Sequence, residues 1–284
     1  MDIRYRCKKR MEQAPAYAKA RFYQNRYEEK RLGQLLCFAG ACLFSKPGSA
    51  GAGYPRRLFL DYEKRKAFAM ASIQAELARY DVISFDVFDT LLRRTFRQPT
   101  DVFAWMEKRM GIPGFARMRT EAEQLARQRS MKSRGTAEIT IEEIYRVLLQ
   151  DLCLRDAGNL GLSIRTPEAW IQAEFVAERS CCMADPRMRA LVKALLQQKK
   201  QVIAVSDMYL NGRQIRRLLL GCGYEGLHKV YASSDYRAGK SDGRLFPIVL
   251  REVGADRRMV HIGDNFYSDV YRQKALPVHT IHYL

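Results

Sequence analysis

The chain has 284 residues, of which 47% are hydrophobic and 28% charged, and this balance excludes the disordered and fibrous classes of protein. The length suits one large α/β domain with an insertion, or a domain of about 200 residues with an extension. The net charge of +18 is densest in the first 80 residues, whose basic runs we interpret as a solvated helical surface, with an acidic partner or a membrane surface as the alternatives.

The cysteines and the N-terminus indicate a compartment. The seven cysteines are odd in number, show no CxxC spacing and lie mostly in apolar surroundings. This usage suits buried thiols in a reducing environment. The N-terminus is basic but has no apolar signal segment close behind it. The sequence therefore predicts a cytoplasmic protein.

A basic helical extension is expected over residues 1–79. Helical patterns cover roughly 14–36 and 57–79, and a linker rich in Gly, Pro and Ser separates them at 46–55. The apolar run at 35–44 is shorter than the ~20 residues that span a bilayer, so a packed helix is favoured over an interfacial anchor. The Lys and Arg runs fit a solvated surface, an acidic partner or a membrane surface, whereas nucleic acid is not favoured.

From residue 80 to 284 the pattern changes to short apolar runs that alternate with helical stretches. This alternation predicts an α/β domain with a Rossmann-like parallel sheet. Strands are expected at Val82–Phe85, Gln201–Val205, Lys229–Ala232, Met259–Ile262 and Val278–Ile281. Because ligands bind beyond the carboxyl ends of such strands, the polar residues that follow the first four should converge on one site.

Between the first two of these strands, an insertion over about Thr95–Pro186 has helical periodicity and no strong strand signal. Thr140 and Glu143 have the spacing of a capping box, which predicts a helix that continues through Leu149. The two tryptophans, Trp105 and Trp170, are expected to pack this insertion. We interpret its spaced charges as a solvated helix face: Arg117, Arg119, Glu121, Glu123 and Arg127.

Acidic residues follow two of the expected strands. Asp86 comes directly after Val82–Phe85, where a carboxylate can attack phosphorus if a cation neutralises the growing charge. Asp264 and Asp269 follow Met259–Ile262 and supply the hard oxygen ligands that such a cation needs. Turn residues are the simpler alternative for Asp264 and Asp269, because Gly-Asp-Asn is also good turn chemistry.

A hydroxyl and a lysine complete the candidate site. Ser206 follows Gln201–Val205 and offers its hydroxyl to phosphate oxygens, or caps a helix that begins near Tyr209. Lys240 follows the strand that ends near Ala232, where an ammonium can screen the nucleophile and hold a phosphoryl group. The four histidines lack metal-ligand spacing, so a zinc site is not expected.

Taken together and in this order, these elements resemble the four motifs of the haloacid-dehalogenase superfamily of hydrolases. The resemblance covers about two hundred residues. It implies a nucleophile at Asp86, a phosphate-binding hydroxyl at Ser206 and the motif lysine at Lys240. It also implies Mg²⁺ held by Asp86, the backbone carbonyl of Phe88 and Asp264, with Asp269 in support. The helical insertion at about 95–186 would then be a mobile cap.

The chain departs from the pattern of the superfamily's phosphatases at one position. In the phosphatases that this chain resembles, a second aspartate usually stands two positions after the nucleophile and acts as general acid. This chain has Phe88 at that position, and its nearby carboxylate, Asp89, comes one residue later. Asp89 is interpreted either as a substitute acid or as a structural residue. The dehalogenase branch also lacks that aspartate, although it does not require the divalent cation that the acidic fourth motif suits.

The amino-acid sequence around the motifs resembles a bacterial subgroup of predicted hydrolases that is associated with glycosyltransferases and surface-polysaccharide systems. The segments concerned are 80–92, 206–210 and 261–265. The resemblance implies a small phosphorylated substrate such as a sugar or nucleotide-sugar phosphate. The leading hypothesis is thus a Mg²⁺-dependent phosphohydrolase. The alternatives are a weak or inactive binding module in polysaccharide biosynthesis and a 2-haloacid dehalogenase.

Overall fold

The computed structural model describes residues 73–96, 98–152, 166–254 and 256–283. The helices and linker predicted within residues 1–72 lie outside the described residues, and only 73–77 of the extension is described as helical. One compact unit comprises Asp81–Asp264 and Ser268–Leu284. The second unit, Met1–Tyr80 with Asn265–Tyr267, falls largely outside the described part of the chain.

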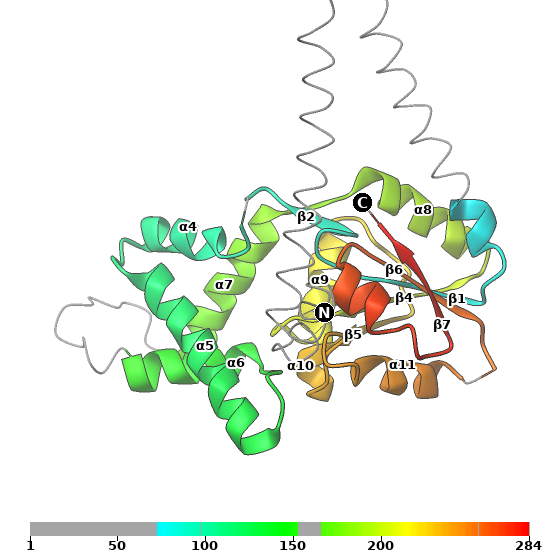
Figure 1. Cartoon of the computed structure of the whole chain (residues 1–284). Helices are drawn as coiled ribbons and strands as arrows, with labels where there is room; N and C mark the ends of the chain where they lie inside the picture. The colour runs from blue at the N-terminus through cyan, green and yellow to red at the C-terminus, as the bar shows by residue number, and fades with distance from the viewer. Residues whose placement is uncertain (1–72, 97, 153–165, 255, 284) are drawn as a thin grey trace, which may run out of the picture. The chain divides into compact units, whose positions relative to one another are not determined.

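A five-stranded parallel sheet forms the centre of the first unit, in the order β5-β4-β1-β6-β7 (Figure 1). This arrangement confirms the predicted Rossmann-like α/β fold. β1 lies in the middle because its four residues are apolar or small and are all buried. The strands are β1 (Val82–Phe85), β4 (Gln201–Ser206), β5 (Lys229–Ala232), β6 (Met259–Gly263) and β7 (Val278–His282).

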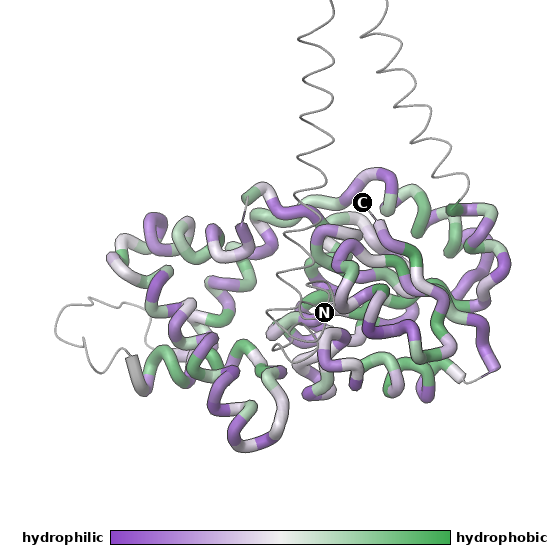
Figure 2. The backbone as a smooth tube through the Cα atoms, in the orientation of Figure 1, coloured by the Kyte–Doolittle hydropathy of each residue, from purple (hydrophilic) through white to green (hydrophobic). Residues whose placement is uncertain are grey.

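Helices cover the sheet. Hydrophobic segments run along its strands, and hydrophilic ones lie mainly on the surrounding helices (Figure 2). Leu245, Phe246 and Val249 of α11 (Leu245–Val253) pack with strand residues such as Val82 and Ile203 in one buried cluster. The elements that follow or precede these strands are α8 (Pro186–Gln197), α9 (Gly212–Gly221), α10 (Ser233–Tyr236), α11 (Leu245–Val253) and the π-helical segment η4 (Phe266–Tyr271).

The predicted insertion is a helical cap, grouped on one side of the sheet in Figure 1. Trp170 is buried in it and stacks on Phe115, with 5.2 Å between ring centroids. No helix in the described part of the chain is long and apolar enough to cross a bilayer. The cap elements are α4 (Asp101–Met110), α5 (Phe115–Arg134), α6 (Ile141–Val147), η2 (Leu148–Leu152) and α7 (Pro167–Cys181).

Two short strands at the base of the cap were not expected from the sequence. β2 (Leu92–Arg94) and β3 (Cys182–Ala184) pair in antiparallel fashion and carry the chain into and out of the cap. Their three-residue length gives no period-2 pattern to detect. The phenol of Tyr224 fixes this pair to the core by donating a hydrogen bond of 2.6 Å to the Leu91 carbonyl.

Capping residues set two helix starts. Thr140 and Glu143 form the predicted capping box of α6, but regular α-helix ends at Val147 and continues as a π-helical turn. The expectation that Ser206 caps a helix near Tyr209 is wrong. α9 begins instead at Gly212, because Asn211 forms its own capping box with Gln214, whose side chain accepts from the Asn211 backbone.

The predicted solvated charge face of α5 is correct for Arg117 but wrong for Arg119. The Arg119 side chain is fully buried and donates two hydrogen bonds to Glu174 of α7, at 2.7 and 2.8 Å. Tyr145 donates a third bond to Glu174 at 2.7 Å. A fixed, paired guanidinium can be buried, whereas periodicity in α5 alone does not reveal a partner 55 residues away.

Gly212 allows α9 to start close against the sheet. A Cβ at this position would lie 2.8 Å from the Val230 carbonyl oxygen and 2.9 Å from the Asp235 carboxylate. We therefore expect Gly212→Ala to lower the free energy of unfolding by about 1–3 kcal/mol, the usual cost of overpacking. Urea denaturation measures the change. The matched control is Gly221→Ala in the same helix, which meets only the Arg179 side chain at 3.4 Å and should be neutral within about 0.5 kcal/mol. Equal effects of the two substitutions would contradict the close contact.

Candidate active site

The carboxyl ends of three neighbouring strands bring the predicted residues together. Asp86 directly follows β1, and its backbone N–H donates to the Ile262 carbonyl of β6 at 2.8 Å. Ser206 is the last residue of β4, which pairs with β1 on the other side. Asp264 directly follows β6. The parallel register of these three strands therefore places their polar ends at one edge of the sheet.

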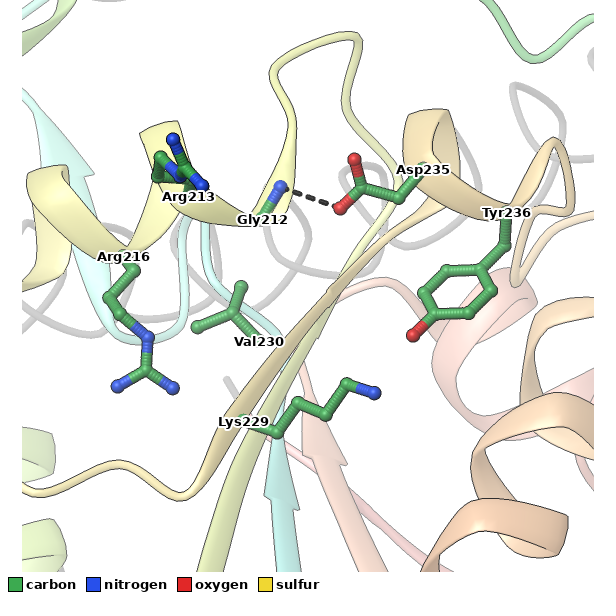
Figure 3. Close-up of a pocket in the computed structure, with 7 residues that line it drawn as sticks. All are labelled: Gly212, Arg213, Arg216, Lys229, Val230, Asp235 and Tyr236. Atoms are coloured by element: carbon green, nitrogen blue, oxygen red, sulfur yellow. Dashed lines mark hydrogen bonds between the residues drawn. The ribbon is translucent and has the colours of Figure 1, made fainter.

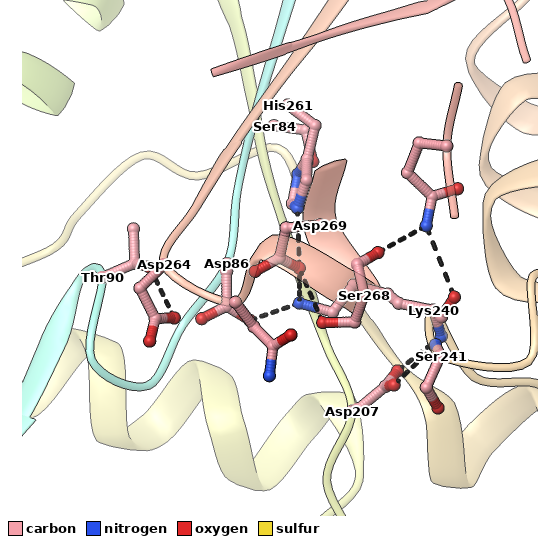
Figure 4. Close-up of polar contacts among 12 residues, drawn as sticks. Ser84, Asp86, Thr90, Asp207, Lys240, Ser241, His261, Asp264, Ser268 and Asp269 are labelled. Carbon is pink, nitrogen blue, oxygen red and sulfur yellow. Dashed lines mark hydrogen bonds and ion pairs between the residues drawn. The ribbon is translucent and has the colours of Figure 1, made fainter. Parts of the chain in front are cut away.

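Three carboxylates meet at this edge (Figure 4). Asp86, Asp264 and Asp269 each present one oxygen atom, and these oxygens all lie within 4.8 Å of one another. Asp269 is fully buried and Asp86 nearly so, while Asp264 is half-buried. Among the residues that the structure describes, no other group of three such side chains is placed to share an ion. The predicted acidic residues are therefore brought together across more than 170 residues of sequence.

Lys240 lies against two of these carboxylates. Its buried ammonium forms an ion pair with the Asp86 carboxylate and another with Asp269, whose Oδ1 lies 2.6 Å from Nζ. Burial acts to lower the pKa of Lys240, but Asp269 and Asp86 outweigh it and hold that pKa above the usual range. Lys240 therefore remains a cation and compensates part of the negative charge of the cluster.

A buried histidine that contacts one of the carboxylates was not predicted from the sequence. His261 of β6 is fully buried, with Nε2 3.2 Å from Asp269 Oδ1 and Nδ1 2.8 Å from the Ser84 hydroxyl of β1. Burial lowers the pKa of His261, against the opposite influence of Asp269. Its contact with Asp269 was not predicted. The alternation of β6 places residue 261 on a defined face, yet no sequence feature names its partners.

A second supporting residue was also missed. The Asp207 carboxylate accepts backbone hydrogen bonds from Lys240 at 2.7 Å and from Ser241 at 3.0 Å. It thereby ties the loop after α10 to the loop after β4. Gln273 continues the support by donating to the Lys240 carbonyl at 3.4 Å and to the Ser268 carbonyl at 2.6 Å. These bonds fix the backbone from which the Lys240 side chain projects.

Crowding of the carboxylates shifts their proton affinities. Burial raises the pKa of Asp86 to about 8; Lys240 opposes this shift, and Asp269 and Asp264 reinforce it. Burial also raises the pKa of Asp264 to about 6, with Asp269 and Asp89 acting in the same direction. Burial acts in that sense on Asp269 too, but Lys240 and His261 outweigh it and hold its pKa below the usual range. One lysine therefore does not compensate all three carboxylates, and the remaining negative charge suits a divalent cation.

The turn after Asp86 contains the remaining predicted residues. Phe88 is half-buried, and the guanidinium of Arg94 lies 4.0 Å from its ring centroid. Asp89 is exposed and has a φ of 62°, a left-handed conformation that Asp tolerates better than most residues. Thr90 is buried and its hydroxyl donates to Asp264 at 3.4 Å. Of the predicted group, Asp89 is therefore the exposed member, and its charge still acts on Asp264.

The cap reaches the core close to these loops. The Ile141 N–H of α6 donates to the Tyr209 carbonyl at 3.0 Å, three residues after Ser206. Arg237, in the loop that leads to Lys240, donates to the Glu138 carbonyl at 3.3 Å. Helix α6 and the segment just before it therefore contact the loop that follows Ser206 and the loop that leads to Lys240.

A separate hollow of about 320 Å³ opens beside the edge strand β5 (Figure 3). The Gly212 N–H already donates to Asp235 there at 2.8 Å, and Lys229 is paired with Glu252. None of the predicted site residues lines this hollow, whose walls are Gly212, Arg213, Arg216, Lys229, Val230, Asp235 and Tyr236. The carboxylate cluster therefore remains the candidate active site.

No family model matches the sequence, and no curated protein is significantly similar to it. Solved structures do resemble it. A defluorinating L-2-haloacid dehalogenase superposes with a TM-score of 0.50 and 14% sequence identity, over 72% of this chain and 80% of that one. The 2-haloacid dehalogenase of Pseudomonas syringae pv. Tomato gives a TM-score of 0.49 at 21% identity, over 72% and 86%. A HAD-family enzyme of Bacteroides thetaiotaomicron gives 0.48 at 13% identity, over 72% and 94%.

The first of these likenesses shows that the chain has the haloacid-dehalogenase fold, in agreement with the parallel sheet and the inserted helical cap. At 14% identity it shows the fold alone. The activity has to be argued from the carboxylates, the lysine and the residues around them.

Proposed function

We propose that this chain is a Mg²⁺-dependent hydrolase that transfers a phosphoryl group first to Asp86 and then to water. The observation that carries the proposal is the meeting of Asp86, Asp264 and Asp269 within 4.8 Å, with Lys240 as their ammonium partner. A carboxylate nucleophile beside two further carboxylates is unsuited to attacking a phosphate dianion unless cations neutralise the charge.

Asp86 acts as the nucleophile in the first step. One of its carboxylate oxygens attacks phosphorus, the bond from phosphorus to the leaving oxygen breaks, and the electron pair departs with the leaving group. A water molecule then attacks the phosphorus of the aspartyl phosphate, which releases inorganic phosphate and restores the Asp86 carboxylate. Two single displacements at phosphorus therefore account for net hydrolysis.

The other residues of the site position the nucleophile and the phosphoryl group. Lys240 holds the Asp86 carboxylate and offers its ammonium to phosphate oxygens, and the buried Ser206 hydroxyl lies at the neighbouring strand end. Asp86, Asp264 and the Phe88 carbonyl would hold Mg²⁺, with Asp269 supporting through Lys240. When bound, Mg²⁺ would neutralise charge on the nucleophile and the phosphoryl oxygens.

The substrate proposed from the sequence is a small phosphorylated metabolite of a bacterial cytoplasm, such as a sugar or nucleotide-sugar phosphate. The helical cap supports a small substrate because its Ile141 N–H and its Glu138 carbonyl contact the loops beside the site. Phosphate release from acetyl phosphate and para-nitrophenyl phosphate, with Mg²⁺ and with a chelator, tests the proposal. Absence of Mg²⁺-dependent release from both would favour the alternative of an inactive binding module.

Proton competition gives a prediction for the metal. In the metal-free protein the pKa of Asp86 is about 8 and that of Asp264 about 6, so both carboxyls bind protons below these values. Mg²⁺ binds the ionised forms, so its affinity rises with pH. Between pH 6 and 8 the proton on Asp86 competes with Mg²⁺ for the carboxylate. We therefore expect the Mg²⁺ dissociation constant to fall about 100-fold over those two pH units. Titration calorimetry in buffers of different pH measures it.

The matched variant for this titration is Asp264→Asn. It removes one ligand and one neighbouring negative charge, so the Mg²⁺ affinity should fall at every pH and the pH dependence should weaken. An affinity that is constant between pH 6 and 8 in the unchanged chain would contradict the assignment of Asp86 as a metal ligand.

Carbon–halogen hydrolysis is a second candidate, favoured by Phe88 in place of a general acid, since a halide ion departs without a proton. The solved dehalogenase with a TM-score of 0.50 shares the fold. The carboxylate cluster argues for a cation-dependent reaction instead. Halide release from a 2-haloacid in the presence of a chelator would establish the second candidate, and a silent assay would remove it.

A further inference from the structure

The residue two positions after the proposed nucleophile has an aromatic side chain that is half-buried. Phe88 lies two residues beyond the nucleophile, and the Arg94 guanidinium covers its ring at 4.0 Å between Cζ and centroid. Glu178 of the cap helix α7 accepts two hydrogen bonds from Arg94, at 3.1 and 3.4 Å. The side chains of this ion pair are 8% and 1% exposed. The pair fixes Arg94 in place against the Phe88 ring.

The buried polar groups next to the nucleophile are engaged in other contacts. Asp269 is held by Lys240 and His261, and Lys240 is itself paired with Asp86. Asp207 accepts two backbone N–H groups. Asp264 belongs to the carboxylate cluster that suits a cation. Apart from the exposed Asp89, no described carboxyl beside Asp86 is free of such a contact to protonate a leaving oxygen.

Building on the proposed phosphoryl transfer, we infer that the site serves substrates whose leaving group departs as a stable anion, namely acyl phosphates and phosphoanhydrides. Hydrolysis of a phosphate ester of an alcohol, such as a simple sugar phosphate, expels a strongly basic alkoxide. That leaving group needs a proton, which Phe88 cannot supply. The carboxylate or phosphate that leaves an anhydride needs none. The substrate class proposed above therefore narrows to compounds with an activated terminal phosphoryl group.

Both steps of the proposed reaction with an acyl phosphate or phosphoanhydride proceed without a general acid. The Asp86 oxygen forms a bond to phosphorus while the bond to the leaving carboxylate or phosphate oxygen breaks, and that oxygen keeps the electron pair. No proton is transferred in this step. In the second step water adds to phosphorus, its protons are taken up by the phosphate product and the solvent, and Asp86 is released as a carboxylate.

A leaving-group series on the full chain tests this inference. Para-nitrophenyl phosphate and phenyl phosphate have nearly the same shape but differ in the basicity of the phenolate that leaves, and glycerol phosphate extends the series to an alkoxide. We expect kcat/KM to fall by roughly 10²- to 10⁴-fold from the nitrophenyl to the glycerol ester, which is the usual contribution of a general acid. Acetyl phosphate should be turned over at least as well as the nitrophenyl ester.

Two variants separate the possible results. Asp89→Asn removes the exposed carboxyl while keeping a side chain that tolerates the left-handed backbone. Asp256→Asn, in the loop before β6 at the opposite edge of the sheet, is the matched control. We expect both variants to keep the steep leaving-group dependence. If Asp89→Asn makes kcat/KM depend more steeply on the basicity of the leaving group, Asp89 acts as an acid and the inference is overturned.

Failure of the inference and failure of the proposed function give different results. Turnover that depends on Asp86 but is equal across the series would overturn the inference and leave phosphoryl transfer standing. Absence of Asp86-dependent turnover with every ester and with acetyl phosphate would overturn both.

Discussion

Replacing Asp86 by Asn is expected to lower the rate of phosphate release by at least about 10³-fold, because an amide oxygen does not form the aspartyl phosphate. The two side chains have the same shape, and the amide oxygen can still accept a hydrogen bond from Lys240. The change therefore removes the attacking oxygen with little disturbance of packing. Steady-state phosphate release from acetyl phosphate at saturating Mg²⁺ measures the effect.

Asp256→Asn again provides the matched control, since it makes the same chemical change at an exposed position and should leave the rate within about twofold. Acid quenching during turnover adds an independent readout. The unchanged chain should retain phosphorus in an acid-stable, hydroxylamine-sensitive acyl phosphate, and Asp86→Asn should retain none. Equal activity of the unchanged chain and Asp86→Asn would contradict the role of Asp86 as nucleophile.

Replacing Arg119 by Met is expected to lower the free energy of unfolding by about 3–5 kcal/mol, because it leaves the buried Glu174 carboxylate without its cation. Both side chains are fully buried, and the Tyr145 hydroxyl is the remaining donor to Glu174. The substitution also removes the guanidinium that lies 4.9 Å from the ring centroid of Tyr209. Urea denaturation followed by circular dichroism measures the loss.

The same helix offers the control. Arg117 pairs with Glu121 at 3.2 Å, but its side chain is 69% exposed, so Arg117→Met should cost less than about 1 kcal/mol. Adding Glu174→Gln to Arg119→Met removes the unpaired charge and should recover part of the loss. Similar, small effects of Arg117→Met and Arg119→Met would show that burial of the Arg119–Glu174 pair is not a source of stability.

The strands and the acidic residues after them could be predicted because each depends on a short stretch of sequence. A buried parallel strand such as Val82–Phe85 is mostly apolar, and the charged residue that follows it marks the strand end. Once the strands are assigned, parallel pairing brings their carboxyl ends to one edge. The convergence of Asp86 and Asp264, 178 residues apart, therefore follows from local patterns plus topology.

The contacts that hold those residues in place could not be predicted, because they depend on pairs of distant side chains. His261 contacts Ser84 across 177 residues, and Arg119 contacts Glu174 across 55. In the sequence, His261 has no metal-ligand spacing, and Arg119 has the spacing of an exposed charge. Only the packing of β6 on β1 and of α5 near α7 decides that these polar groups are buried and paired.

The start of helix α9 is another feature that depends on a distant contact and could not be predicted from the sequence alone. Ser206 at the end of β4 and the polar residues between β4 and α9 are possible caps, and Ser206 is as good a cap by type as Asn211. The choice of Asn211 follows from Gln214 three residues later and from the absence of a Cβ at Gly212, where the helix meets the Val230 carbonyl. The capping-box spacing was visible in the sequence, whereas the close approach to β5 was not.

A crystal structure with Mg²⁺ and beryllium fluoride, a mimic of the phosphoryl group, tests the central claim most directly. We predict one cation bound by the carboxylates of Asp86 and Asp264 and the backbone carbonyl of Phe88. Beryllium should be joined to an Asp86 oxygen, and Lys240 should contact a fluorine atom. A cation bound elsewhere, or a fluoride complex that does not involve Asp86, would contradict the account.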